Sequence, residues 1–182
     1  TETGGTPVDN PFVKRDGALP EIFTYGNRNV QGAALHPRTG ELWAHEHGPQ
    51  GGDELNILRG GRNYGWPVIT HGRTYGLGRT IGDGTERVDV PRALKIWLPR
   101  SIGPSGLTFY TGRLFPEWRD SVFMGALAAQ ELVRLTLKGD AVTAEERIGG
   151  FGRVRDVREG GDGALYVLSE SLGTLYRLTP IE

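Results

Sequence analysis

The sequence contains no cysteine, so neither a disulfide framework nor a thiolate metal site is available to it. No run approaches the roughly 18 apolar residues of a membrane span, and we therefore expect no membrane insertion. Residues 1–10 have neither the basic start nor the apolar run of a signal peptide, so an export signal would lie upstream of Thr1. The formal net charge is only -1, with both signs interspersed, and we expect no nucleic-acid partner.

Glycine and proline, by contrast, are abundant. The 182 residues include 29 glycines and 11 prolines without a collagen-like period, which indicates many tight turns between short strands. The 37% hydrophobic and 24% charged residues are typical of a globular protein that can bury a sizeable core. This composition favours an all-β fold with few or no helices, and residues 115–118 could form a single helical turn.

A repeat near the end of the chain indicates how the strands are organised. Residues 132–136 (LVRLT) return as residues 175–179 (LYRLT) after a period of 43 residues. A strand-built unit that recurs every 40 to 50 residues or so is typical of a β-propeller blade, which cannot bury both of its faces alone. We distinguish three such copies, and three blades do not close a ring.

Each copy is predicted to hold three strands. They are residues 32–36, 41–44 and 54–57, then 106–110, 121–124 and 132–135, then 154–158, 164–168 and 173–178. A long excursion, about residues 61–104, separates the first copy from the second and has no clean periodicity. Long irregular insertions in a β scaffold are usually functional loops, and loops on one face of a propeller commonly build its site.

The first candidate binding segment is residues 25–32 (YGNRNVQG), which combines one arginine with several amide side chains between two glycines. A guanidinium donates several hydrogen bonds in a fixed plane, so this combination suits a flat ligand that carries carboxylates or carbonyls. The alternative is a strand entry stabilised by Asx-type turns, with no ligand.

The second candidate segment is residues 45–54 (HEHGPQGGDE). His45 and His47 could form a metal pair on one face of a strand, but no third convergent ligand is visible. A hard-cation site is better supported, because Glu54 offers carboxylate oxygens and the Gly-Pro and Gly-Gly elements free nearby carbonyls for a cation such as calcium. The alternative is simply a charged turn before a strand.

The third candidate segment is residues 153–156 (RVRD). Arg153 and Arg155 would lie on one face of a strand, roughly 7 Å apart by the two-residue rise, and paired arginines at a strand start can bind an anion. The alternative is a pair of solvent-facing charges with Asp156 as their partner.

These segments carry a family resemblance. The chain resembles the soluble quinoprotein aldose (glucose) sugar dehydrogenases, six-bladed β-propellers that use pyrroloquinoline quinone (PQQ) and calcium. The ordered motifs that match are residues 25–32, 45–54, 63–67 (NYGWP) and 153–158 (RVRDVR). The resemblance is to the C-terminal half of that family, which implies about three blades of a six-bladed ring, with residues 1–182 as part of a single propeller domain.

The resemblance also implies roles for individual residues. The residues implied in cofactor binding are Arg28, Asn29, Tyr75, Ala128, Arg153 and Arg155. The first two would contact the quinone carbonyls, the last two would hold the cofactor's carboxylates, and Ala128 stands where some relatives carry a cofactor-binding lysine. The residues implied in calcium binding are Glu54, the backbone carbonyl of Tyr64, and the carbonyls of Gly48 and Pro49.

The activity that this resemblance implies is oxidation of an aldose at its anomeric carbon to a lactone, by hydride transfer to the quinone. The family's general base is a histidine of the N-terminal half, and none of His36, His45, His47 and His71 matches its motif. We therefore expect this chain to bind cofactor and calcium but to need the missing N-terminal half for catalysis. The family implies a periplasmic or secreted location.

Two other interpretations remain open. The chain could be a calcium-binding propeller module that recognises carbohydrate or a partner without redox chemistry, which the alanine at position 128 and the absent base favour. It could also pair as a homodimer, because open strand edges of an incomplete ring invite pairing between copies.

Overall fold

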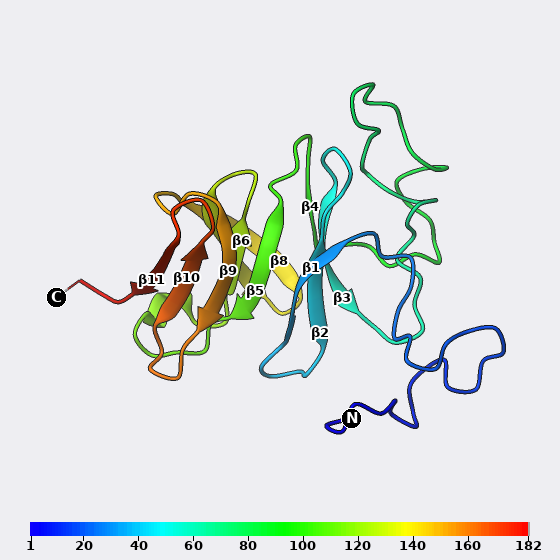
Figure 1. Ribbon diagram of the computed structural model, residues 1–182, viewed down its shortest axis with the longest axis horizontal. Coiled ribbons are helices and arrows are strands. Elements are labelled where there is room, and N and C mark those ends of the chain that lie inside the picture. Colours follow the sequence, from blue (N-terminus) through cyan, green and yellow to red (C-terminus); the bar gives the residue numbers. More distant parts are fainter. Residues whose placement is uncertain (182) are drawn as a thin grey trace.

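The computed structural model describes residues 1–181 and contains three antiparallel sheets that stand side by side (Figure 1). A single turn of 3-10 helix, Pro116–Trp118, is the only helical element among these residues, in agreement with the turn predicted there. None of the described helices is long and apolar enough to span a membrane. The all-β prediction is therefore confirmed.

The first blade consists of four strands in the order β1-β2-β3-β4. They are β1 (Val30–Leu35), β2 (Leu42–Glu46), β3 (Asp53–Leu58) and β4 (Lys95–Trp97). The chain between β3 and β4 forms long loops at one side of the blade, and residues 1–29 precede the first strand (Figure 1).

The second blade is also four-stranded, and the third has three strands. The second contains β5 (Pro104–Phe109), β6 (Val122–Ala126), β7 (Glu131–Lys138) and β8 (Ala141–Ile148), and the third contains β9 (Val154–Glu159), β10 (Leu165–Ser169) and β11 (Thr174–Leu178). The inner strands β1, β5 and β9 pack against one another in that order, as expected for blades around a common axis. The chain is thus three blades of a β-propeller.

Apolar side chains fill the spaces between the blades. Trp43 and Leu55 of the first blade pack against Leu107 and Met124 of the second, and all four are fully buried. A second core joins the next two blades and includes Phe123 and residues of β9 and β10. Burying each large apolar side chain contributes roughly 1.5–3 kcal/mol, so these two interfaces hold the blades together.

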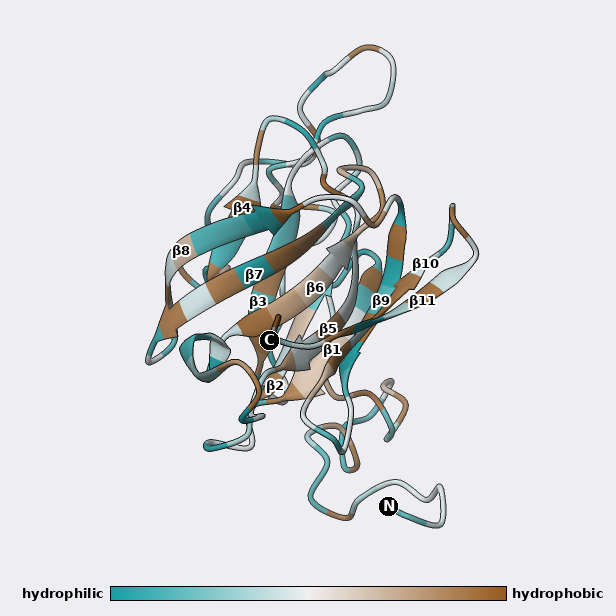
Figure 2. Cartoon of the chain, turned by 90° about the vertical axis from the view of Figure 1, so that its left-hand side faces the viewer, coloured by the Kyte–Doolittle hydropathy of each residue, from teal (hydrophilic) through white to brown (hydrophobic). Residues whose placement is uncertain are grey.

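All nine predicted strands are present, but the outer strands β4 and β8 were not predicted. β4 has only three residues and lies inside the irregular excursion, which it divides. β8 has three charged residues in a row, Glu145 to Arg147, and Figure 2 shows this hydrophilic stretch beside the alternating β7. The 43-residue period holds from β6 to β10 and from β7 to β11, whereas β5 and β9 start 50 residues apart because the loop after β9 is shorter.

The two end blades each leave a face open. Leu35 on β1 is 65% exposed, and Leu168 and Leu175, which are cross-strand partners on β10 and β11, are 41% and 62% exposed. The third sheet also has an unpaired edge at β11 where the other two sheets continue to a fourth strand. These are the surfaces that further blades would cover in a closed ring.

Candidate functional site

Side-chain hydrogen bonds between blades bring the starts of the three inner strands together. The His47 Nε2 atom lies 2.7 Å from the Pro104 carbonyl oxygen, at the start of β5. The Ser105 hydroxyl donates to the Val154 carbonyl, at the start of β9, over 2.5 Å. Segments 25–32, 45–54 and 153–156 therefore lie at the same end of the blade array, the second blade standing between the first two segments and the third.

Arg28 and Asn29 lie in the loop that leads into β1. The Arg28 Nη1 atom donates to the His47 carbonyl over 2.9 Å, and its guanidinium carbon lies 5.2 Å from the centre of the Trp66 ring. The ring face favours the positive charge and limits where the guanidinium can turn. Beneath the loop, the buried Glu46 carboxylate accepts hydrogen bonds from the backbone N–H groups of Arg28 and Asn29.

A cavity of about 420 Å³ joins five of the predicted residues. These are Arg28, Asn29, Gly48, Pro49 and Tyr75, and the cavity is also lined by Arg100. No acidic side chain lines it, so its two arginines give it a positive charge that suits an anionic ligand. Tyr75 is 70% exposed and offers a ring face at the rim of this cavity.

The turn that carries Gly48 and Pro49 is held by a carboxylate. Asp53 is fully buried and accepts hydrogen bonds from the Gly48 N–H at 2.9 Å and from the backbone of residues 102–103. The carbonyls of Gly48 and Pro49 accept no hydrogen bond from any described residue. Both residues are buried and line this cavity, so a cation there would satisfy two oxygens that have no protein partner.

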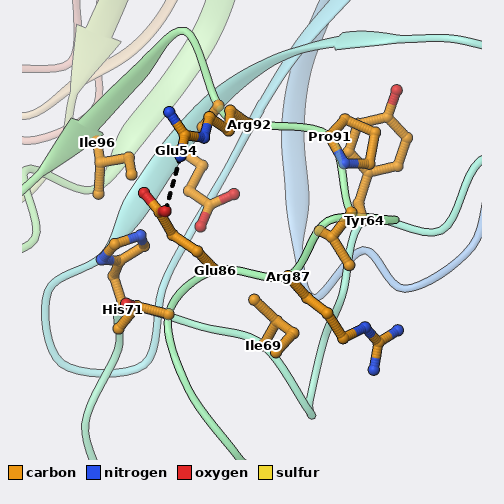
Figure 3. A pocket seen from close by; sticks show the side chains of 12 residues that line it. Glu54, Tyr64, Ile69, His71, Glu86, Arg87, Pro91, Arg92 and Ile96 are labelled. Carbon is orange, nitrogen blue, oxygen red and sulfur yellow. Dashed lines mark hydrogen bonds and ion pairs between the residues drawn. The ribbon is translucent and has the colours of Figure 1, made fainter.

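Glu54 and Tyr64 meet in a neighbouring cavity of about 120 Å³ (Figure 3). Burial and, to a lesser degree, the negative charge of Glu46 raise the pKa of the Glu54 carboxyl to about 7, against the opposing effect of a hydrogen bond from Asn56. The Tyr64 hydroxyl donates to the Ile57 carbonyl, and the Tyr64 carbonyl accepts no hydrogen bond from the described residues. A partly buried carboxylate and an unbonded carbonyl, on two residues that line one cavity, are oxygen donors of the kind that a hard cation prefers.

Other charged groups of this second cavity are partly neutralised. The Glu86 carboxylate pairs with Arg92 at 2.9 Å, as the dashed line in Figure 3 marks, and His71 lies on the same wall. Within residues 1–181, no group of three or more histidine, aspartate or glutamate side chains converges as a metal cluster. Any cation held here would therefore depend on backbone oxygens and water for most of its ligands.

The two histidines of segment 45–54 both reach the second blade. The His45 Nε2 atom lies 2.8 Å from the Gly106 carbonyl oxygen, and a Cβ at Gly32 would come within 2.5 Å of that ring nitrogen. Burial lowers the pKa of His45 to about 4, so the ring is neutral at pH 7. Because His47 also bonds to a β5 carbonyl, both rings join blades and do not converge as a metal pair.

Arg153 and Arg155 lie at the start of the third blade, and Ala128 lies in the turn between β6 and β7 of the second. None of the three lines the 420 Å³ cavity. Arg153 pairs with Glu170 at 2.7 Å and donates to the Leu127 carbonyl at 3.2 Å, next to the exposed Ala128. The exposed Arg155 side chain has no hydrogen bond or ion pair with any described residue, so it is free to bind an anion.

The structural interpretation of segment 153–156 is only partly supported. Asp156 pairs with Arg158 at 3.1 Å and with neither of the two preceding arginines. Arg153 does have an acidic partner, but that partner comes from beyond β10 and not from its own strand.

Sequence reasoning missed three residues that hold this site, namely Glu46, Asp53 and Trp66. The first two lie inside a candidate segment, yet apart from the bond of Asp53 to Gly48 their hydrogen-bond partners are 17 to 50 residues away in the sequence. Such pairs become visible only when the strand register is known, since the cross-strand partner of Glu46 on β1 is Val30, which follows residues 27–29 directly. Trp66 belongs to the matched segment 63–67, and that was its only signal.

Comparisons with known proteins agree with this arrangement. A sequence model of the Glucose / Sorbosone dehydrogenase family matches residues 1–177. An aldose sugar dehydrogenase of Escherichia coli is 43% identical over 99% of this chain. A crystal structure of a glucose dehydrogenase superposes on the whole chain with a TM-score of 0.93 and 49% identity. The PQQ-bound form of an aldose sugar dehydrogenase from Streptomyces coelicolor covers 93% of the chain with a TM-score of 0.69 and 30% identity.

The matched proteins are about twice as long as this chain. The alignment spans 49% of the E. coli protein, 53% of the glucose dehydrogenase structure and 44% of the S. coelicolor structure. The chain therefore corresponds to about half of a propeller in these relatives, as the three-blade count from the repeat predicts. With a family match over nearly its whole length, the chain belongs to the Glucose / Sorbosone dehydrogenase family.

Proposed function

We propose that this chain is the C-terminal half of a PQQ-dependent aldose sugar dehydrogenase that oxidises aldoses at the anomeric carbon to lactones. The observation that carries this proposal is the positively charged cavity that joins Arg28, Asn29 and Tyr75 to the free carbonyls of Gly48 and Pro49. The similar aldose sugar dehydrogenase from S. coelicolor binds PQQ, which supports the same cofactor for this chain.

The cofactor would be held from two sides. Arg28 and Asn29 would donate hydrogen bonds to the quinone carbonyls, and Arg28 would lie where negative charge develops on reduction. Arg155 would pair with a cofactor carboxylate, and Arg153 would do so from its position beside Glu170. Alanine at position 128 offers no charge, so the two arginines would carry most of the carboxylate binding at the third blade.

Calcium is proposed at two places. The Gly48 and Pro49 carbonyls would hold an ion at the edge of the cofactor cavity, and Glu54 with the Tyr64 carbonyl would hold another next to it. Both donor sets consist of oxygen atoms, which calcium prefers, and both include a carbonyl without a hydrogen-bond donor in the described chain.

The general base would come from outside this chain. His36 accepts backbone N–H bonds from residues 38–39, and His45 and His47 bond to β5 carbonyls, so these rings already have structural roles. When bound, the quinone would supply the acceptor for the hydride of the sugar. The residues of this chain would orient that acceptor and stabilise its charge, while an N-terminal half would remove the hydroxyl proton.

The remaining blades would close the ring over the open faces at β1 and at β10–β11. The exposed Leu168 and Leu175 pair fits an apolar blade interface of the kind that joins the second and third blades. An export signal and a periplasmic or secreted location stay predictions, as does the absence of a nucleic-acid partner.

The test is a dye-reduction assay with the full-length protein, PQQ and calcium, offered a panel of aldoses. We expect aldose-dependent reduction above a blank without sugar, and loss of the signal when calcium is chelated. If the protein retains quinone absorbance after dialysis but no aldose gives dye reduction above the blank, the redox proposal is wrong. If no quinone is retained, the binding-module interpretation is favoured. Light scattering on the same sample distinguishes a monomer from the homodimer.

A further inference from the structure

The buried carboxylate of Glu46 lies directly beneath the loop that carries Arg28 and Asn29. It is 7% exposed and stands at the end of β2, opposite the start of β1. One of its oxygens accepts the N–H of Arg28 and, at 3.2 Å, the N–H of Asn29. The other oxygen accepts the Asn27 side-chain amide at 3.4 Å. Three consecutive residues are thus tied to one carboxylate.

Residues 27–29 lie between two paired stretches of backbone and belong to neither. Just before them, Tyr25 and Gly26 bond to the backbone of residues 62–66. β1 begins at Val30, and the ladder with β2 is irregular between Val30 and Gly32. The Asn29 carbonyl accepts the His47 N–H at 3.0 Å, and this bond comes from the residue next to Glu46. The backbone of Arg28 and Asn29 is therefore held by two neighbouring residues at the end of β2, while residues 62–66 anchor the chain just before it.

Glu46 does not touch the open cavity through which a ligand would meet Arg28. The 420 Å³ cavity is lined by Arg28, Asn29 and His47 but not by Glu46. The carboxylate is satisfied by backbone and amide donors, and it makes no ion pair with any arginine in the described chain. Glu46 does line a narrow neighbouring pocket with Arg28 and Glu54. At the 420 Å³ cavity itself, however, it can act only through the loop, and saturating calcium in the experiment below keeps this effect apart from any effect on a cation at Glu54.

We infer that Glu46 is a positioning residue, whose carboxylate sets the backbone of Arg28 and Asn29 so that both side chains present their donors to the quinone. This inference rests on the proposed function of those two residues. The action is geometric: it requires an acceptor oxygen at the distance reached by a glutamate side chain, and it does not require the negative charge itself.

The experiment measures PQQ affinity of the full-length protein and of three variants by absorbance titration in saturating calcium. Glu46→Ala removes the acceptor, and Glu46→Asp keeps the charge but withdraws the oxygen by one methylene group. Glu46→Gln keeps an oxygen at the original reach without the charge. We expect Glu46→Ala and Glu46→Asp to weaken PQQ binding by roughly 10- to 100-fold, the effect typical of losing a group that orients a ligand-binding residue, and Glu46→Gln to stay within about threefold of wild type.

Glu159→Ala is the matched control, because the Glu159 carboxylate also accepts a backbone N–H, that of Thr111, at the opposite end of β9. It should lower stability without changing PQQ affinity. Equal affinity of wild type and Glu46→Ala overturns the inference, as does a Glu46→Gln affinity as low as that of alanine. If Glu46→Ala does not fold, the comparison of Glu46→Asp with Glu46→Gln decides the question. Failure of wild type to bind PQQ instead overturns the proposed function.

Discussion

The first and third blades present their predicted ligand-binding arginines in opposite ways. Arg28 lies in a cavity, over a tryptophan ring, on a loop tied to a buried carboxylate. Arg155 is exposed and has no partner in the described chain, and Arg153 has only a surface ion pair and one carbonyl. The part of the site on the first blade is therefore organised before any ligand binds. The part on the third blade offers positive charge, but few contacts fix its side chains.

This difference follows from what each blade packs against. The first blade has the second blade on one side and the loops of residues 61–104 beside it, and buried carboxylates tie these parts together. The third blade has a neighbour on one side only, and its sheet has three described strands where the others have four. With a neighbouring blade on one side only, the arginines of β9 have few side chains packed around them. Further blades would supply these contacts.

The largest effect is expected at Asp53. Its fully buried carboxylate accepts three backbone N–H groups and the Ser101 hydroxyl, so Asp53→Ala leaves several buried donors unsatisfied. We expect urea unfolding to show a loss of about 3–5 kcal/mol. The control, Arg38→Ala, removes only a solvent-exposed ion pair with Asp120 and should cost less than about 1 kcal/mol. Equal losses would contradict the claim that the first blade carries the organised half of the site.

Next in size is an acid-dependent effect at His45. Its folded-state pKa of about 4 lies below the ordinary value of 6.5, so the neutral ring stabilises the fold above pH 6.5. That stability is lost as the pH falls from 6.5 through 4, by roughly 3 kcal/mol in total. Urea unfolding at several pH values should show this loss in wild type, and the loss should be much smaller in His45→Gln, which cannot titrate. If the free energy of unfolding falls with pH equally in both proteins, protonation of His45 does not cause the loss.

A smaller effect is expected between the second and third blades. The buried Ser105 hydroxyl donates to the Val154 carbonyl, and Ser105→Ala should cost about 1–2 kcal/mol in urea unfolding. Thr143→Ala removes an exposed hydroxyl bond to the Thr136 carbonyl and serves as the control, with a change within about 0.5 kcal/mol. A Ser105→Ala protein as stable as wild type would show that apolar packing alone aligns the third blade.

The smallest effect is expected at the surface pair of the third blade. The Arg153 and Glu170 side chains are 41% and 47% exposed, so Glu170→Ala should change the free energy of unfolding by less than about 1 kcal/mol, and by still less in high salt. A loss above about 2 kcal/mol in urea unfolding would show that the third blade is as firmly built as the first, and would remove the contrast between them.

The sequence predicted the architecture well because the signals for it are local. Alternating apolar residues and turn glycines mark β6, β7, β10 and β11, and the repeat of residues 132–136 relates the blades. β8 was missed because its apolar and polar residues do not alternate, and β4 because three residues carry no period.

The site was predictable as a set of residues but not as a geometry. Motif segments pointed to Arg28, Asn29, Gly48 and Pro49, and the family resemblance added Tyr75; one cavity joins these five residues. The carboxylates that hold these segments were not identified, because a glutamate that accepts backbone N–H groups looks like any surface glutamate in a sequence. Their role depends on register and on loops that are distant along the chain.

The most direct test of this account is a crystal structure of the full-length protein with PQQ and calcium. The account predicts quinone density at the meeting point of the inner strands, with Arg28 and Asn29 at its carbonyls, Arg155 at a carboxylate, and calcium on the Gly48 and Pro49 carbonyls. A quinone bound elsewhere, or Arg28 and Arg155 facing separate surfaces of the closed ring, would contradict it.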